Sequence, residues 1–219
     1  MSGIMLSVIG RSYIVPPPVI GSAYQGGYMG GQISYAANGT AGNGVAQYNL
    51  IVSPAATGST STVWKTSSTA STSPDGTDGW ANSVALNTAG HSAVNFCRAL
   101  TIGGYTDWYL PSMNEMEILY WNLKPDNVSH AATIWPGNEF AIPSRYGLQN
   151  YSTHPGQTPV AIFQAGGAQA ITGNFWSSNN WGNQWGRYFD IGSGGFAWGM
   201  AKYYNNGVRA IRRVGVGTV

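Results

Sequence analysis

The chain has 219 residues, 43% of them hydrophobic, which suffices for one main domain with a buried core. Only 8% of the residues are charged and the formal net charge is +2, so neither nucleic acid nor an acidic membrane is expected as a partner. Cys97 is the only cysteine, which excludes an intrachain disulfide and a metal site made of several cysteines; we expect its thiol to be buried.

Residues 1–30 are predicted to form an attachment or oligomerisation segment. The apolar stretch 4–9 is followed by three consecutive prolines at 16–18, which stop regular structure and can act as a spacer, and then by glycine-rich sequence. The apolar stretch lacks a preceding basic region and is too short to span a bilayer. We therefore expect no signal peptide and no membrane insertion, and we assign residues 31–219 to a single binding domain.

Short strands are predicted at residues 32–36 and 48–52, the second of which ends before Pro54. Residues 55–77 consist almost wholly of Ser, Thr, Ala and Gly. This composition predicts a long loop, in which Trp64 is expected to insert into the core as an anchor.

Two helices follow, and each has one apolar stripe. The first begins near Ser92, has apolar residues at i, i+3, i+4 and i+7 from Ala93 to Leu100, and stops at two glycines at 103 and 104. The second begins with the capping box of Ser112 and Glu115 and ends before Pro125. We expect both helices to pack against a sheet or against each other. A third, weaker helix is predicted at residues 159–164.

The C-terminal part has the pattern of short strands separated by Gly, Asn and Ser turns. They are predicted at residues 175–178, 184–191, 196–202 and 208–214. In the last strand Val208 and Ala210 are expected to face the core and Arg209 the solvent. Helices followed by a run of strands predict an α+β fold with an antiparallel sheet.

Two motifs resemble a known family. Residues 93–119, which include Phe96, Cys97 and Leu100 and end in GGYTDWYLPSMNEMEIL, resemble the GYxDWxLPSxxEL helix-loop-helix of the DUF1566 group, with Met116 in place of the leucine. The FWSS of residues 175–178, Trp185, Phe189 and the VRAIRR of residues 208–213 resemble its closing YWSS…AW…F…VRAVRR pattern. The resemblance implies a C-type-lectin-like fold of two helices packed on short antiparallel sheets. That family occurs in bacterial adhesins, in phage tail fibres and in proteins diversified by reverse-transcriptase retroelements.

No catalytic group of residues and no metal-binding site is predicted. Asp107 is expected to satisfy backbone donors in a turn, and Glu117 to lie on the wet face of its helix. Arg212 and Arg213 either bind a phosphate or carboxylate or, as we favour, pack their stems on aromatic rings. The calcium motifs of sugar-binding C-type lectins are absent, as are the paired cysteines of the formylglycine-generating enzymes of the same fold. We expect no cofactor. The remaining acids and the histidines show no pairing or ligand spacing: Asp75, Asp78, Glu115, Asp126, Glu139, Asp190, His91, His130 and His154.

Residues 174–206 have the composition of an evolved binding surface, with ten aromatic residues, six asparagines and only three charges. Trp176, Trp185 and Phe189 are expected to lie in the core, and the side chains next to them in the strand to point outward. The alternative is that all these aromatics fill a core or a subunit interface. The predicted ligand-binding residues are Asn179, Asn180, Trp181, Asn183, Gln184, Gly186, Tyr188, Asp190, Phe196, Trp198, Tyr203, Tyr204 and Asn205.

These observations predict a non-catalytic receptor-binding protein at the tip of a phage tail fibre or similar virion appendage, assembled as a homotrimer. Its partners would be a host cell-surface protein or glycan, and other virion proteins through residues 1–30. A bacterial surface adhesin and a structural virion protein are the alternatives. Because asparagine codons are rich in adenine, diversification of residues 174–206 by a retroelement is a further hypothesis.

Overall fold

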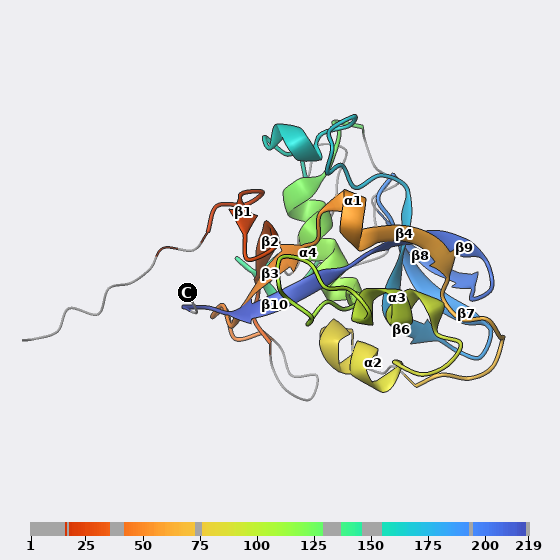
Figure 1. Cartoon of the computed structure of the whole chain (residues 1–219). Coiled ribbons are helices and arrows are strands. Elements are labelled where there is room, and N and C mark those ends of the chain that lie inside the picture. The colour runs from red at the N-terminus through yellow and green to blue at the C-terminus, as the bar shows by residue number, and fades with distance from the viewer. Residues whose placement is uncertain are drawn as a thin grey trace, which may run out of the picture.

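The computed structural model describes residues 16, 18–35, 42–72, 76–128, 137–145, 155–192 and 195–217, and only the backbone of residues 195–198. Within these ranges the chain forms an α+β fold of four α-helices and ten strands in two five-stranded sheets. The longest helix crosses the centre of the molecule between the sheets, as Figure 1 shows in green. No helix in these ranges is long and apolar enough to cross a membrane.

The first sheet is antiparallel and contains strands from both ends of the described chain. Its order is β1 (Ala23–Tyr24), β2 (Gly27–Ile33), β3 (Tyr48–Val52) and β10 (Ile211–Gly215), with β5 (Ala141–Ile142) also paired to β2. The strand predicted at 48–52 is confirmed, whereas the one predicted at 32–36 begins and ends earlier. Residues 1–15 and 17 of the expected attachment segment lie outside the described residues, and residues 23–30 belong to this sheet.

The second sheet has the order β4 (Ser59–Val63), β9 (Asn205–Arg209), β6 (Asn174–Trp181), β7 (Trp185–Asp190) and β8 (Gly195–Ala201). Only the short pairing between β6 and β9 is parallel; the other pairs are antiparallel. The strands predicted at residues 175–178, 184–191 and 196–202 are thus present, as β6, β7 and β8. The residues expected to form a long loop contain strand β4 and the short helix α1 (Ala55–Gly58) instead.

The prediction of one strand over residues 208–214 was wrong. The backbone of Ala210 donates to Gly58 O at 2.9 Å and accepts from Ser53 N at 3.0 Å, so the chain changes sheets at this residue, from β9 to β10. The same crossing buries Arg209, which was expected to face solvent. Its Nε donates to Ser53 O at 2.7 Å and its NH2 group to Gln169 at 3.0 Å.

The central helix, α4 (Met113–Leu123), begins as predicted. The Ser112 hydroxyl accepts from Glu115 N, and the Glu115 carboxylate accepts from Ser112 N at 2.7 Å. The expectation of a single apolar stripe was wrong, because residues 113–120 are all buried. The helix packs between two sheets: the methyl groups of Leu119 lie against Gly30 in the first, and the Tyr120 ring lies 5.4 Å from that of Phe189 in the second. A helix covered on both sides is apolar around most of its circumference.

A second hydrophobic core lies on the side of the second sheet that faces away from α4, and two of the smaller helices cover it. α3 (Ser92–Arg98) begins where predicted and buries Cys97, and α2 (Gly79–Ala85) was not predicted. The expected helix at 159–164 is reduced to the single turn η2 (Ala161–Phe163). Trp64 is 1% exposed, which confirms its prediction as an anchor, and this second core also contains Trp108 and Trp176.

Candidate functional site

Three loops meet at one end of the second sheet and form the most exposed aromatic surface among the described residues. They are the segment after β4, the turn between β6 and β7, and the turn between β8 and β9. We call their exposed residues the display surface. It comprises Thr66, Ser67, Ser68, Thr69, Ala70, Thr72, Gly182, Asn183, Gln184, Trp185, Tyr203, Tyr204 and Asn205.

Three large aromatic side chains lie on this surface, and charged side chains are absent from it. Trp185 is 47% exposed, Tyr203 52% and Tyr204 56%. The two tyrosine rings lie against each other with their centroids 4.9 Å apart. Serine, threonine and side-chain amides fill the rest of the display surface. Such a surface recognises a partner through short-range stacking and hydrogen bonds.

Lys202, beneath the display surface, ties its loops together. The Lys202 side chain is fully buried, and its ammonium group donates to Thr69 O at 3.2 Å, Gly182 O at 3.1 Å and Asn183 O at 3.0 Å. It also lies 4.9 Å from the centre of the Trp64 ring. Burial and the neighbouring Lys65 lower the pKa of Lys202 to about 8. Carbonyl dipoles balance the charge of the Lys202 ammonium group, and its hydrogen bonds hold two loops together.

Replacing Lys202 with methionine should free these loops. Met keeps most of the length of the side chain, but it leaves Gly182 O and Asn183 O without the ammonium donor and Thr69 O with only the longer bond from Lys65 Nζ at 3.4 Å. We expect a loss of about 1–3 kcal/mol in the free energy of unfolding. Hydrogen exchange at residues 66–72 and 182–184 should become faster, whereas exchange in α4 should not change. Equal acceleration in both regions would show that Lys202 stabilises the whole fold and does not act on these loops in particular.

The segment 66–72 joins the display surface through further polar contacts. Lys65 Nζ donates to Ala70 O at 2.9 Å and to the Ser71 hydroxyl at 3.0 Å, and Asn180 Nδ2 donates to Ser71 O at 2.7 Å. His91 Nε2 lies 2.9 Å from the Ser71 hydroxyl, and its pKa is lowered by burial and by Lys65 and Lys202. This segment was not among the predicted ligand-binding residues, because its run of Ser, Thr and Ala gives no local signal for a partner about a hundred residues away in the sequence.

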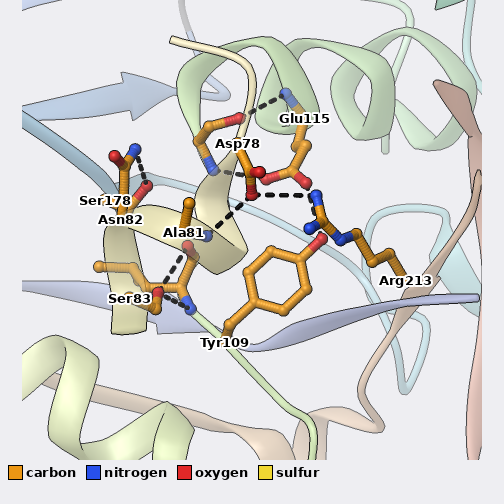
Figure 2. A network of polar contacts seen from close by, with 10 residues as sticks. Asp78, Ala81, Asn82, Ser83, Tyr109, Glu115, Ser178 and Arg213 are labelled. Carbon is orange, nitrogen blue, oxygen red and sulfur yellow. Dashed lines mark hydrogen bonds and ion pairs between the residues drawn. The ribbon is translucent and has the colours of Figure 1, made fainter. Parts of the chain in front are cut away.

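A bulge in β6 positions the hairpin that carries Trp185. Between Trp176 and Asn180 the pairing of β6 with β7 changes register. The Ser177 hydroxyl still donates to Arg187 O of β7 at 3.0 Å, whereas the next two residues bond elsewhere. Ser178 N donates to Pro111 O at 2.7 Å, and Asn179 Oδ1 accepts from Met113 N at 2.8 Å, in the first turn of α4. Figure 2 shows Asn82 of α2 donating to the Ser178 hydroxyl at 3.1 Å. The base of the hairpin is therefore fixed to two helices.

The same network continues to β10 through buried charged groups (Figure 2). Asp78 caps α2 by accepting from Ala81 N at 2.8 Å and pairs with Arg213 at 2.9 Å. Glu115 accepts from the Tyr109 hydroxyl at 2.6 Å. Burial raises the pKa of Glu115 to about 7, against the opposing effect of its donors and Arg213. These groups are internal and mutually bonded, so they join elements and do not form an open site.

The structure changes several expectations about the predicted ligand-binding residues. Asn179 and Gly186 are buried, so the expected exposure of Asn179 and the outward direction of Gly186 were wrong. Gly186 lies under the rings of Trp64 and Trp176. Of the remainder, Asn183, Gln184, Tyr203, Tyr204 and Asn205 are exposed, Asn180, Trp181, Tyr188 and Asp190 are half-buried, and the side chains of Phe196 and Trp198 lie outside the described residues.

Trp185 was expected in the core and is exposed. It shares a face of β7 with Phe189, as predicted from the alternation, but α4 covers this face only near Phe189, whose ring contacts Tyr120. Four residues along a strand span about 13 Å, so Trp185 lies at the other end of the hairpin. Trp176 and Phe189 are in the core, which confirms those two predictions.

Other polar predictions also change. Glu117 is buried in an ion pair with Arg145 at 2.9 Å and does not lie on a wet face. Asp107 binds the guanidinium of Arg212 at 2.7 and 2.9 Å instead of backbone donors. Both alternatives for Arg212 and Arg213 are found together: their guanidinium groups lie over the rings of Tyr105 and Tyr48, and each also binds a carboxylate, that of Asp107 or Asp78. Asp75, His130 and His154 lie outside the described residues.

In the ranges that the structure describes, no three His, Cys, Asp or Glu side chains come together in a group that could hold a metal ion. No family model matches this chain, and neither a curated protein nor a solved structure matches it.

Proposed function

We propose that the protein is a non-catalytic receptor-binding module with a C-type-lectin-like fold of the DUF1566 kind, and that the display surface meets the receptor. The observation that carries the proposal is the exposure of Trp185, Tyr203 and Tyr204 on a surface without charged side chains. Trp and Tyr are enriched among the few residues that contribute most of the binding energy of protein interfaces. We attribute the exposure of three such rings to the binding of a partner and not to packing within the fold.

The rigidity of the display surface supports the same proposal. Its loops are fixed from below by Lys202 and Lys65, and the base of its hairpin is fixed by α2 and the first turn of α4. A surface already held in one conformation loses less entropy on binding than a mobile one. Loops that hydrogen bonds hold in one conformation are more typical of a recognition surface than of a sheet edge that only contacts solvent.

The setting that we propose is the tip of a phage tail fibre or a similar virion appendage, as a homotrimer attached through residues 1–30. The receptor would be a host cell-surface protein or glycan. The motifs at residues 103–119 and 208–213 support this setting. A bacterial surface adhesin and a structural virion protein remain the alternative assignments, and diversification of residues 174–206 remains a hypothesis that the neighbouring genes would test.

The test compares three purified, fluorescently labelled proteins on a panel of intact bacterial strains. We expect the wild type to bind at least one strain saturably, and the variant Trp185→Ala/Tyr204→Ala to bind it at least about 30-fold more weakly, the effect of losing one interface hot spot. Val45→Ala/Val128→Ala removes exposed apolar side chains outside both the display surface and residues 1–30, and should bind like the wild type. Both variants change only exposed residues, so both should remain folded.

Equal binding by the wild type and Trp185→Ala/Tyr204→Ala would show that the display surface is not the binding site. Binding to no strain in a broad panel would contradict receptor recognition and favour a structural virion protein. Adhesin and tail-fibre assignments are separated by the location of the native protein, on the cell surface or on purified particles.

A further inference from the structure

Arg187 differs from the other arginines of the described chain. Its guanidinium carbon lies 5.1 Å from the centre of the Trp181 ring, and no acceptor for its N–H groups occurs within the described ranges. The side chain is half-buried, and burial alone accounts for the lowering of its pKa. A guanidinium group has five N–H donors, so the donors of Arg187 are available to hydrogen-bond a ligand.

The remaining arginines in these ranges all have acceptors. Arg145, Arg212 and Arg213 each bind a carboxylate, at 2.7 to 2.9 Å. Arg209 donates to Ser53 O, and Arg98 donates to Trp108 O at 3.2 Å. The other described arginines therefore donate hydrogen bonds to acceptors within the fold. Arg187 is the exception, and it lies at the edge of the display surface.

The surroundings of Arg187 form a small platform on one face of the hairpin. Trp181 pairs directly with Trp185, and Arg187 follows two residues later on the same face. A Cβ atom at Gly199 would lie 2.8 Å from the Trp181 ring, so this ring rests on the bare backbone of β8. The platform thus consists of two indole rings and one guanidinium group, and Trp185 connects it to the display surface.

Among the described residues, the charge at this end of the second sheet is positive. Arg187, Lys65 and Lys202 make no contact with a carboxylate in the part of the chain described, whereas Asp78, Asp107 and Glu117 are each bound to another arginine. The two lysines are buried and bonded to carbonyl groups, which leaves Arg187 as the cation that a partner can reach. Charge complementarity then favours a partner with an acidic group at this position.

We propose that Arg187, supported by Trp181 and flanked by Trp185, binds a side-chain carboxylate of an acidic segment in a protein partner. This inference rests on the proposed function. The planar guanidinium group matches a carboxylate with two parallel hydrogen bonds, and stacking on an indole ring holds it in one orientation. A combination of Trp, Tyr and Arg is typical of the centre of protein interfaces, which favours a protein over a glycan.

The test uses defined probes and NMR signals of the intact chain. Acetyl-Gly-Glu-Gly-amide should shift the Arg187 Nε–H and Trp185 Nε1–H signals saturably, and acetyl-Gly-Gln-Gly-amide should bind at least tenfold more weakly. Arg187→Gln should reduce binding of the Glu peptide at least tenfold. Arg98→Gln is the matched control, because Arg98 also stacks on an indole ring, that of Trp80 at 4.2 Å, and this variant should bind like the wild type.

Several outcomes would overturn the inference. Equal binding of the two peptides, or unchanged binding by Arg187→Gln, would remove the carboxylate site. If 3′-sialyllactose bound more tightly than the Glu peptide, with lactose inactive, the acidic group would belong to a glycan and the proposed partner class would be wrong. Shifts without saturation would mean that the probe is only a counterion.

The cell-binding assay separates this inference from the proposed function. If Trp185→Ala/Tyr204→Ala lost binding to a bacterial strain while Arg187→Gln kept it, the inference would fail and the proposed function would stand. If all these variants bound like the wild type, the display surface itself would be wrongly assigned. Loss of binding in both variants, but not in Arg98→Gln, would support both proposals.

Discussion

Trp64→Ala should lower the free energy of unfolding by about 3–5 kcal/mol, the usual cost of removing a large buried aromatic side chain. Trp64 is 1% exposed, and its ring contacts that of His91 with centroids 5.5 Å apart. Its Nε1 donates to Ser177 O at 2.8 Å, and its ring lies under Lys202. The substitution therefore leaves a cavity, an unpaired carbonyl group in the bulge of β6 and a buried ammonium group that has lost its aromatic neighbour.

The chain supplies a matched control for this substitution in Trp185→Ala. Trp185 is 47% exposed, so its removal should cost less than about 1 kcal/mol. Urea unfolding followed by circular dichroism would measure both. If Trp64→Ala did not fold, Trp64→Phe should still unfold cooperatively at a lower urea concentration than the wild type. Equal effects of Trp64→Ala and Trp185→Ala would contradict the assignment of Trp64 as the anchor of the second core.

Glu115→Gln should change how stability depends on pH. Burial raises the pKa of Glu115 from an ordinary value of 4.5 to about 7. An acid that is weaker in the folded chain than in the unfolded chain stabilises the fold fully below pH 4.5, and this contribution is lost as the pH rises toward 7. The total change corresponds to about 3 kcal/mol. Glutamine keeps the capping geometry, because its oxygen accepts from Ser112 N and its amide donates to the Tyr109 hydroxyl.

Urea midpoints between pH 5 and 8 would test this expectation. The wild type should lose stability relative to Glu115→Gln as the pH rises, and above pH 7 the variant should be the more stable protein. Taking the difference at each pH removes the contribution of His91, whose lowered pKa acts in the opposite direction as the pH falls through 6.5. A difference that does not vary with pH would mean that Glu115 titrates in the folded chain as it does in the unfolded chain.

Local patterns predicted the elements whose signal is contained in neighbouring residues. The capping box of Ser112 and Glu115 and the proline after Lys124 determine where α4 begins and ends, and both ends were predicted correctly. Strand β3 was predicted at its observed residues. Alternation along β7 correctly placed Trp185 and Phe189 on one face, but it could not indicate how far a helix would cover that face.

The errors concern residues whose environment is decided by distant parts of the chain. Glu117 and Arg209 looked like solvent-facing residues, since charged side chains are seldom buried without a partner. Their partners, Arg145 and Ser53, lie 28 and 156 residues away in the sequence. The division of residues 208–214 between two sheets has the same origin, because it depends on hydrogen bonds from Ala210 to Ser53 and Gly58.

The sequence by itself determined the α+β class, the central helix and the presence of an uncharged, aromatic C-terminal region, because these follow from composition, spacing and caps. Only the tertiary structure decided which of those aromatics face water, that residues 66–72 join them, and that Arg187 has no acceptor in the described chain. Exposure and hydrogen-bond satisfaction depend on which segments pack together in space. That packing follows from burying apolar surface across the whole domain, and no short window of sequence contains it.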